Sequence, residues 1–123
     1  MNKERYWEII KIANEQSSGD RKILISKINS LLKRKKDASK FYDITFKLIE
    51  DNYLNNERLE KVLNKMSPNG YISDDFFQYI VAGIISRGEE VYNLIMDNPK
   101  NIRKIDNNIY NWEFEEFMYI GLD

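Results

Sequence analysis

Apolar residues recur at helical spacing along almost the whole chain, and no segment shows the alternation that is typical of strands. With 123 residues, the chain has the length of one domain with one core. We therefore expect an all-α fold, a single compact domain over residues 1–123 with five to seven helices. The predicted helices are one that ends at the polar stretch 17–20, one over 21–35, one that starts at Asp37 or Ser39, and others over 57–66, 73–86, 89–98 and 111–123.

Residues 70–92, GYISDDFFQYIVAGIISRGEEVY, contain the most apolar of these helices. Its apolar stripe is too broad for a surface helix, so we expect residues 73–86 to form the buried centre of the domain. Ser73 fits an N-cap, and Asp74 and Asp75 fall in the first turn, where the helix dipole favours acids. These preferences explain why Ser, Asp and Asp stand at 73–75. A ligand site at the helix start is the alternative explanation. Gly83 predicts the close approach of a neighbouring helix or aromatic ring.

The chain contains neither cysteine nor histidine. Disulfides, thiolate nucleophiles, Cys-ligated metals, Ser–His relays and imidazole ligands are therefore excluded. Carboxylates remain, and the candidates for acid–base or Mg²⁺ chemistry are Asp74, Asp75, Glu113, Glu115 and Glu116. Adjacent acids on a helix point about 100° apart, so the aspartates alone are not a paired site. We expect no enzyme, no cofactor and no metal.

The charges are divided unevenly along the sequence. Residues 1–47 carry 12 Lys/Arg against 6 Asp/Glu, and residues 48–123 carry 7 against 14, for a formal net charge of −1. The two halves could neutralise each other within the fold, or the uneven charge could attract a charged partner. The densest basic run is Lys33, Arg34, Lys35 and Lys36, which we expect in the last turn of the second helix.

Four blocks of the chain form a recognisable pattern. They consist of Tyr6, Trp7 and Ile10; of Ser73, Asp74, Asp75, Phe77 and Tyr79; of Ile85, Ser86, Gly88, Val91 and Tyr92; and of Glu115, Phe117 and Tyr119. Together these blocks resemble the DUF4240 family, a bacterial domain of unknown function that is sometimes found beside regulators of the WGR type. The resemblance implies a helical domain over the whole chain and brings no established activity.

Eight tyrosines and two tryptophans, with an acidic second half, are typical of a protein that binds another protein. We expect a non-enzymatic interaction domain, for example an immunity or inhibitor protein that neutralises a toxin or other effector with a cationic surface. The predicted contact residues are Tyr71, Asp74, Asp75, Tyr110, Trp112, Glu113, Glu115 and Glu116. Trp112 is also expected to point inward with Phe117, and its role as an anchor depends on which orientation holds.

The alternative function is a regulatory or nucleic-acid-associated module of a WGR-type system that uses the basic run 33–36. A sequence pI of about 5.6 argues against a dedicated nucleic-acid binder. The charged N-terminus does not resemble a signal peptide, and no apolar run is long enough to span a membrane. We therefore expect a cytoplasmic protein without membrane contact.

Overall fold

The computed structural model describes residues 1–122 and confirms the all-α fold. Within these residues there is no strand, and the helices follow one another as a series of seven α-helices and two 3-10 helices. They are α1 (Lys3–Ser17), α2 (Arg21–Leu31), α3 (Lys35–Asn55), α4 (Glu57–Met66), α5 (Asp74–Ser86), α6 (Glu89–Asp97), α7 (Asn101–Ile105), η1 (Ile109–Asn111) and η2 (Glu115–Tyr119).

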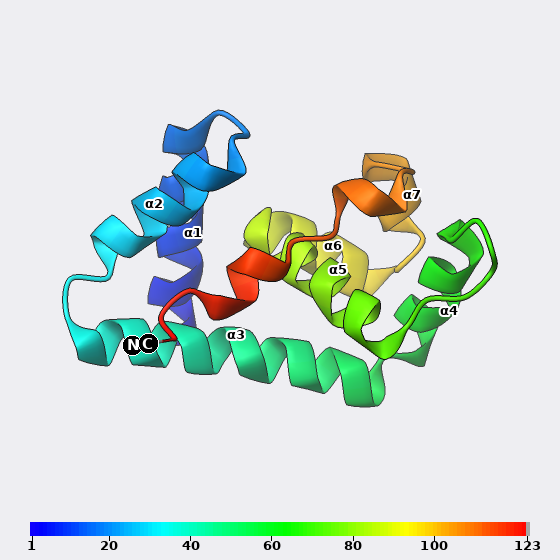
Figure 1. Ribbon diagram of the computed structural model, residues 1–123, viewed down its shortest axis with the longest axis horizontal. Coiled ribbons are helices and arrows are strands. Elements are labelled where there is room, and N and C mark those ends of the chain that lie inside the picture. Colours follow the sequence, from blue (N-terminus) through cyan, green and yellow to red (C-terminus); the bar gives the residue numbers. More distant parts are fainter. Residues whose placement is uncertain (123) are drawn as a thin grey trace.

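The long helix α3 runs along one side of the molecule, and the other elements lie over it (Figure 1). The pair α1 and α2 covers one end, whereas α4 to α7 lie toward the other end. The segment after α7 returns across the middle, and η2 packs against both α5 and α3. The described chain ends beside the start of α3, where Gly121 approaches the Ala38 carbonyl.

Side-chain caps define several helix starts. The Ser73 hydroxyl accepts a hydrogen bond from the Phe76 amide at 3.1 Å, as the sequence predicts. Asp20 caps α2 by accepting from the Ile23 amide at 3.0 Å, and Asn56 caps α4 by accepting from the Leu59 amide at 3.1 Å. Each cap satisfies a backbone N–H that has no partner within its helix. These starts are therefore fixed by local chemistry.

The helix α5 is the buried centre of the domain, as its broad apolar stripe predicts. Every residue from Ile80 to Ser86 is buried. A Cβ atom at Gly83 would lie 1.5 Å from the carbonyl oxygen of Trp112, so the backbone after η1 lies directly on the helix. The predicted close approach is confirmed, and the partner is a backbone segment.

The expected boundary between the second and third helices is wrong. The helix α2 ends at Leu31, and Lys35 and Lys36 lie in the first turn of α3 instead of the last turn of α2. Leu32, which follows the last residue of α2, is buried in the core and has a non-helical backbone conformation, so the helix ends there. Asp37, which pairs with Arg34 at 3.1 Å, then provides the acidic residue that favours a helix start.

The last part of the chain also differs from the expectation. The sequence predicts one helix over 111–123, whereas the structure has two short 3-10 helices and, before them, the unpredicted α7. Phe114, Phe117 and Ile120 are buried at a spacing of three residues, which is the period of a 3-10 helix. Within the described chain, no helix combines the length and the apolar character needed to cross a membrane.

Replacing Gly83 with alanine is expected to destabilise the domain by about 3 kcal/mol or more, because the added methyl group would overlap a backbone carbonyl. This loss should occur even though alanine favours a helix by about 1 kcal/mol relative to glycine. Urea denaturation would measure it. Gly70→Ala is the control, since its Cβ meets no atom within 4 Å and only a positive φ of 77° adds strain. An unchanged stability of Gly83→Ala would contradict this packing.

Candidate functional site

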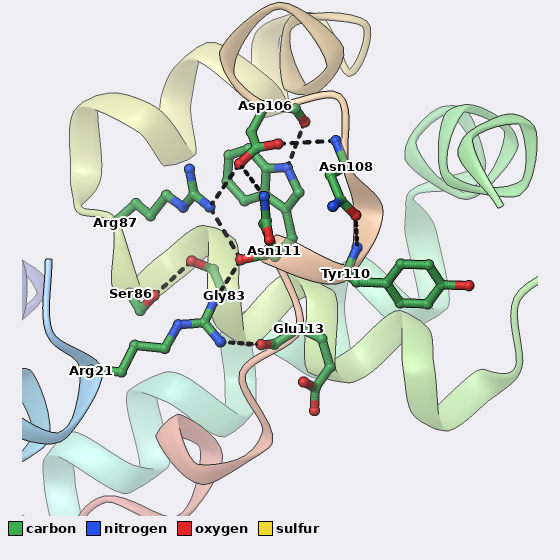
Figure 2. A network of polar contacts seen from close by, with 10 residues as sticks. Arg21, Gly83, Ser86, Arg87, Asp106, Asn108, Tyr110, Asn111 and Glu113 are labelled. Atoms are coloured by element: carbon green, nitrogen blue, oxygen red, sulfur yellow. Dashed lines mark hydrogen bonds and ion pairs between the residues drawn. The ribbon is translucent and has the colours of Figure 1, made fainter.

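The segment after α7 carries many of the predicted contact residues, and two arginines hold it on α5 (Figure 2). Arg21, at the start of α2, donates to the Glu113 carbonyl and, at 2.6 Å, to the Asn111 carbonyl. Arg87, at the end of α5, donates to the same Asn111 carbonyl at 3.2 Å. The Phe114 amide donates to the Tyr79 carbonyl at 3.0 Å. Together these bonds fix the backbone path of residues 111–114.

Trp112 is fully buried, so the prediction that its ring is an exposed partner anchor is wrong and the inward orientation is confirmed. Its indole N–H donates to the Asp106 carbonyl at 2.9 Å, and the Arg87 guanidinium lies over the ring, 3.7 Å from its centroid. The backbone of Trp112 lies against Gly83, and its ring is held by these two contacts. An aromatic residue in this position packs the core and cannot reach a partner.

Tyr71 and Tyr110 are the exposed aromatics that the sequence predicts, with exposed fractions of 65% and 60%. They line one shallow hollow of about 490 Å³, although they are far apart in sequence. Phe76 also lines this hollow, and its ring centroid lies 5.9 Å from that of Tyr110. In Figure 2 the Tyr110 ring points away from the arginine network.

The predicted acids come together only in part. Asp75 and Glu115 lie beside Tyr79 and Tyr119: partial burial raises the pKa of both phenols, and these two carboxylates raise it further. The Tyr119 hydroxyl donates to Glu115 at 3.4 Å. The start of α5 and η2, which are 40 residues apart in sequence, therefore form one acidic surface.

Asp74 belongs to the same region but faces another tyrosine. Its hydrogen-bonding carboxylate raises the pKa of Tyr53 on α3, and the charges of Glu60 and Asp75 act in the same direction. Glu116 is exposed and Glu113 is partly exposed. In Figure 2 the Glu113 carboxylate points away from Arg21, which binds only the carbonyl.

Next to these acids lies an apolar hollow of about 280 Å³ between α3, α5 and η2, which we call the aromatic groove. Its rings are more exposed than is usual for large apolar side chains: Phe46 is 52% exposed, Tyr119 48% and Tyr53 41%. The rings of Tyr42 and Phe46 stack 6.2 Å apart. The residues that line the groove include Tyr42, Phe46, Ile49, Glu50, Tyr53 and Tyr119.

The sequence analysis did not identify this groove, although α3 contains a signal for it. Tyr42, Phe46 and Tyr53 recur at i, i+4 and i+11, which places them on one helix face. That face is offset by one residue from the buried stripe of Phe41, Thr45 and Asn52. The second wall comes from η2, and no local pattern in α3 predicts its position.

Five carboxylates lie in the groove or act on its tyrosines, and we call them the acidic rim: Glu50, Glu60, Asp74, Asp75 and Glu115. Glu50 lines the groove and Glu115 accepts from the Tyr119 hydroxyl, while Asp74, Glu60 and Asp75 raise the pKa of Tyr53. Among residues 1–122, none of the five forms an ion pair; the ion pairs there are Arg5–Glu8, Arg34–Asp37, Lys47–Asp51 and Arg87–Asp106. Within the described part of the chain, direct pairing between the basic and acidic halves is limited to Lys47–Asp51 on α3. The negative charge of the rim is therefore available to a partner.

The basic run 33–36 lies at the junction of α2 and α3, and all four of its side chains are exposed. Arg34 is committed to Asp37, and this pairing raises the pKa of Arg34 and lowers that of Asp37. Among the residues that the structure describes, no group of three or more acidic side chains is arranged to hold a metal ion.

A comparison with protein families matches residues 1–123 to the family described as a protein of unknown function, DUF4240. The chain belongs to the DUF4240 family. No curated protein and no solved structure shows significant similarity to it. The blocks that carry the resemblance meet in the fold, since Asp75 and Tyr79 of one block lie beside Glu115 and Tyr119 of another.

Removing the charge of Glu115 is expected to lower the pKa of Tyr79 and Tyr119, because a neighbouring carboxylate disfavours each phenolate. An NMR titration of the tyrosine ring carbons in Glu115→Gln would measure the change. Glu116→Gln is the matched control, since Glu116 is the next residue and is not among the groups that act on either phenol. Equal titration curves in the wild-type protein and Glu115→Gln would show that η2 does not bring this carboxylate to α5.

Proposed function

We propose that this DUF4240 domain is a non-enzymatic binding module in the cytoplasm, and that it holds a cationic segment of another protein in the aromatic groove. The observation that carries the proposal is the combination, at one place, of exposed rings with carboxylates that form no ion pair among residues 1–122. Apolar rings favour contact with a partner, and the surrounding charge selects which partner.

The rings supply the affinity in this proposal. Tyr and other aromatic side chains are enriched among the residues that dominate binding energy at interfaces, because they bury a large area at a small entropic cost. Phe46, Tyr53 and Tyr119 are each about half exposed, so a partner that covers them removes apolar surface from water. The stacking of Tyr42 on Phe46 holds one wall of the groove in place before binding.

The acidic rim supplies the selectivity. Five carboxylates without an ion pair among the described residues attract a positively charged segment and repel an acidic one. A Lys or Arg side chain placed over the rings would also gain a cation–π interaction of about 0.5–2 kcal/mol. The groove, about 280 Å³ in volume, is large enough for one or two side chains of the partner.

An immunity or inhibitor protein that covers a cationic toxin or effector is the version of this function that fits the acidic surface best. Tyr71 and Tyr110 offer further aromatic contact area near the start of α5. The alternative is a regulatory or nucleic-acid-associated module of a WGR-type system, and the exposure of all four basic side chains at 33–36 keeps that alternative open to experiment.

Neutralising the rim with Asp75→Asn and Glu115→Gln is expected to slow association with the partner about tenfold at low salt and to flatten its salt dependence. Charges at the edge of an interface act mainly on the association rate. Surface plasmon resonance at two salt concentrations would measure both effects. Glu15→Gln is the control, because this exposed acid lies on α1 and does not line the groove.

Phe46→Ala is expected to speed dissociation by at least about tenfold, which corresponds to about 1.4 kcal/mol, with a small effect on association. The ring is 52% exposed, so its removal should leave the stability of the domain nearly unchanged in urea denaturation. Leu94→Ala is the matched control: Leu94 is 47% exposed on α6, outside the groove, and the substitution should not affect binding.

The partner can be recovered from extracts of the native host with the wild-type domain as bait and Phe46→Ala as a parallel bait. A cationic protein that the wild type retains and the variant loses would support the groove. An acidic partner would contradict the proposal. Binding that is insensitive to salt and is lost when Lys33–Lys36 are replaced by glutamine would favour the nucleic-acid-associated alternative.

A further inference from the structure

A second hollow, of about 510 Å³, lies on the face of the molecule where the α1–α2 turn, the end of α5 and the segment 106–114 meet. Its volume falls in the range of small-molecule sites. Polar groups dominate the lining, in contrast to the aromatic groove. They include Asn14, Asp20, Arg21, Ser86, Arg87 and Asn111.

Two guanidinium groups from different helices converge at this hollow, and each is held against an aromatic ring. The Cζ atom of Arg21 lies 4.4 Å from the Phe114 ring centroid, and that of Arg87 lies 3.7 Å from the Trp112 centroid. Both groups donate to the single carbonyl oxygen of Asn111, so one small anion could reach both. The rings and the shared carbonyl fix the positions of the two cations. Figure 2 shows the two guanidinium groups meeting at the Asn111 carbonyl.

Most of the donors of these arginines have no acceptor among residues 1–122. A guanidinium carries five N–H donors. Arg21 donates from Nη1 to the Glu113 carbonyl and from Nη2 to the Asn111 carbonyl. Arg87 has one hydrogen bond, to Asn111, and a looser ion pair of 3.9 Å with Asp106. Several N–H groups beside the hollow are therefore available to a ligand.

Two carboxylates, Asp20 and Asp106, line the hollow together with the two arginines. Asp106 is the carboxylate that acts on Arg87, and it already accepts from the Asn108 amide at 2.9 Å and the Asn111 side chain at 3.0 Å. Partial burial lowers the pKa of Arg87, and the charge of Arg21 lowers it further. Asp20 is engaged as the cap of α2. Among residues 1–122, the ion pair of these two arginines is therefore limited to the 3.9 Å contact of Arg87 with Asp106.

We propose that this hollow binds the phosphate group of a small organic phosphate through Arg21 and Arg87. A tetrahedral phosphate can accept hydrogen bonds from two guanidinium groups that approach from different directions, whereas a planar carboxylate matches one guanidinium. The Asn14 side chain donates to the Ser86 carbonyl at 2.9 Å and closes one side of the hollow. The remaining volume accommodates the organic part of the ligand.

The alternative is that the two arginines only fasten the segment 111–114 to the core. The two cases differ in one measurable respect. A fastening role requires no ligand, so the protein would respond to phosphate only through ionic strength. A binding site gives a saturable response that depends on the guanidinium fork of Arg87.

The test is a titration of the isotopically labelled full chain with inorganic phosphate, glycerol phosphate and acetate, at matched ionic strength and pH. Saturable NMR shifts at the amides of Ser86, Arg87 and Asn111 are expected with both phosphates, and at least tenfold weaker binding is expected with acetate, whose single carboxylate matches one guanidinium. Arg87→Lys keeps the positive charge but loses the fork, and it should bind both phosphates at least tenfold more weakly.

Arg103→Gln is the control, because Arg103 lies on α7, donates to Asn107 at 3.2 Å and does not line the hollow. It should bind as the wild type does. Because Arg87→Lys could loosen the segment, the folded state of each variant is checked from the dispersion of its spectrum, and Arg21→Lys serves as the second variant. Shifts that do not saturate, equal binding of acetate, or unchanged binding in both lysine variants would overturn the proposal.

Discussion

The contact of the Trp112 backbone with Gly83 is the constraint on which both surfaces of this domain depend. A Cβ at position 83 would lie 1.5 Å from the Trp112 carbonyl oxygen, so only glycine lets the segment after η1 lie on α5. That path allows the Phe114 amide to bond to the Tyr79 carbonyl and buries Trp112, Phe114 and Phe117. It then places η2 as one wall of the aromatic groove and the Asn111 carbonyl between the two arginines.

The helices under this segment are held by a core in which the buried polar groups are paired. The Thr45 hydroxyl donates to the Phe41 carbonyl at 3.2 Å, so the Tyr6 hydroxyl, 2.6 Å away, donates its own proton to Thr45. Burial raises the pKa of Tyr6 well above its ordinary value and keeps the phenol neutral. Asn52 joins α3 to α6 by donating to the Tyr92 hydroxyl at 3.0 Å. These bonds specify how α1, α3 and α6 fit together, and they leave Tyr42, Phe46 and Tyr53 on the outer face of α3.

The parts of this fold that the sequence predicts are those that local chemistry determines. The start of α5 at Ser73, the bounds of α4 and the end of α6 before Pro99 follow from caps, spacing and the missing proline N–H. The prediction fails where tertiary packing decides, as at the buried Leu32 and in the 3-10 segment after α7. For the site, Tyr71, Tyr110, Asp75 and Glu115 are exposed or partly exposed as expected. The sequence does not predict whether Trp112 is buried, nor does it predict the aromatic groove. Both depend on contacts with residues that are distant in sequence.

The two candidate sites differ in their chemistry, since one is an acidic aromatic groove and the other is a polar hollow with two arginines, yet they share the segment 106–122 as a structural wall. On one side its backbone carbonyls accept hydrogen bonds from Arg21 and Arg87. On the other side, Glu115 and Tyr119 lie at the groove. The segment is short and contains only 3-10 turns, so its position depends on anchors rather than on its own helical stability. The carbonyls that the arginines bind, at Asn111 and Glu113, directly precede η2 (Glu115–Tyr119), which forms the groove wall. We therefore expect a change that loosens one end of the segment to alter the other. A binding measurement at either surface is therefore also a measurement of how firmly this segment is held on α5.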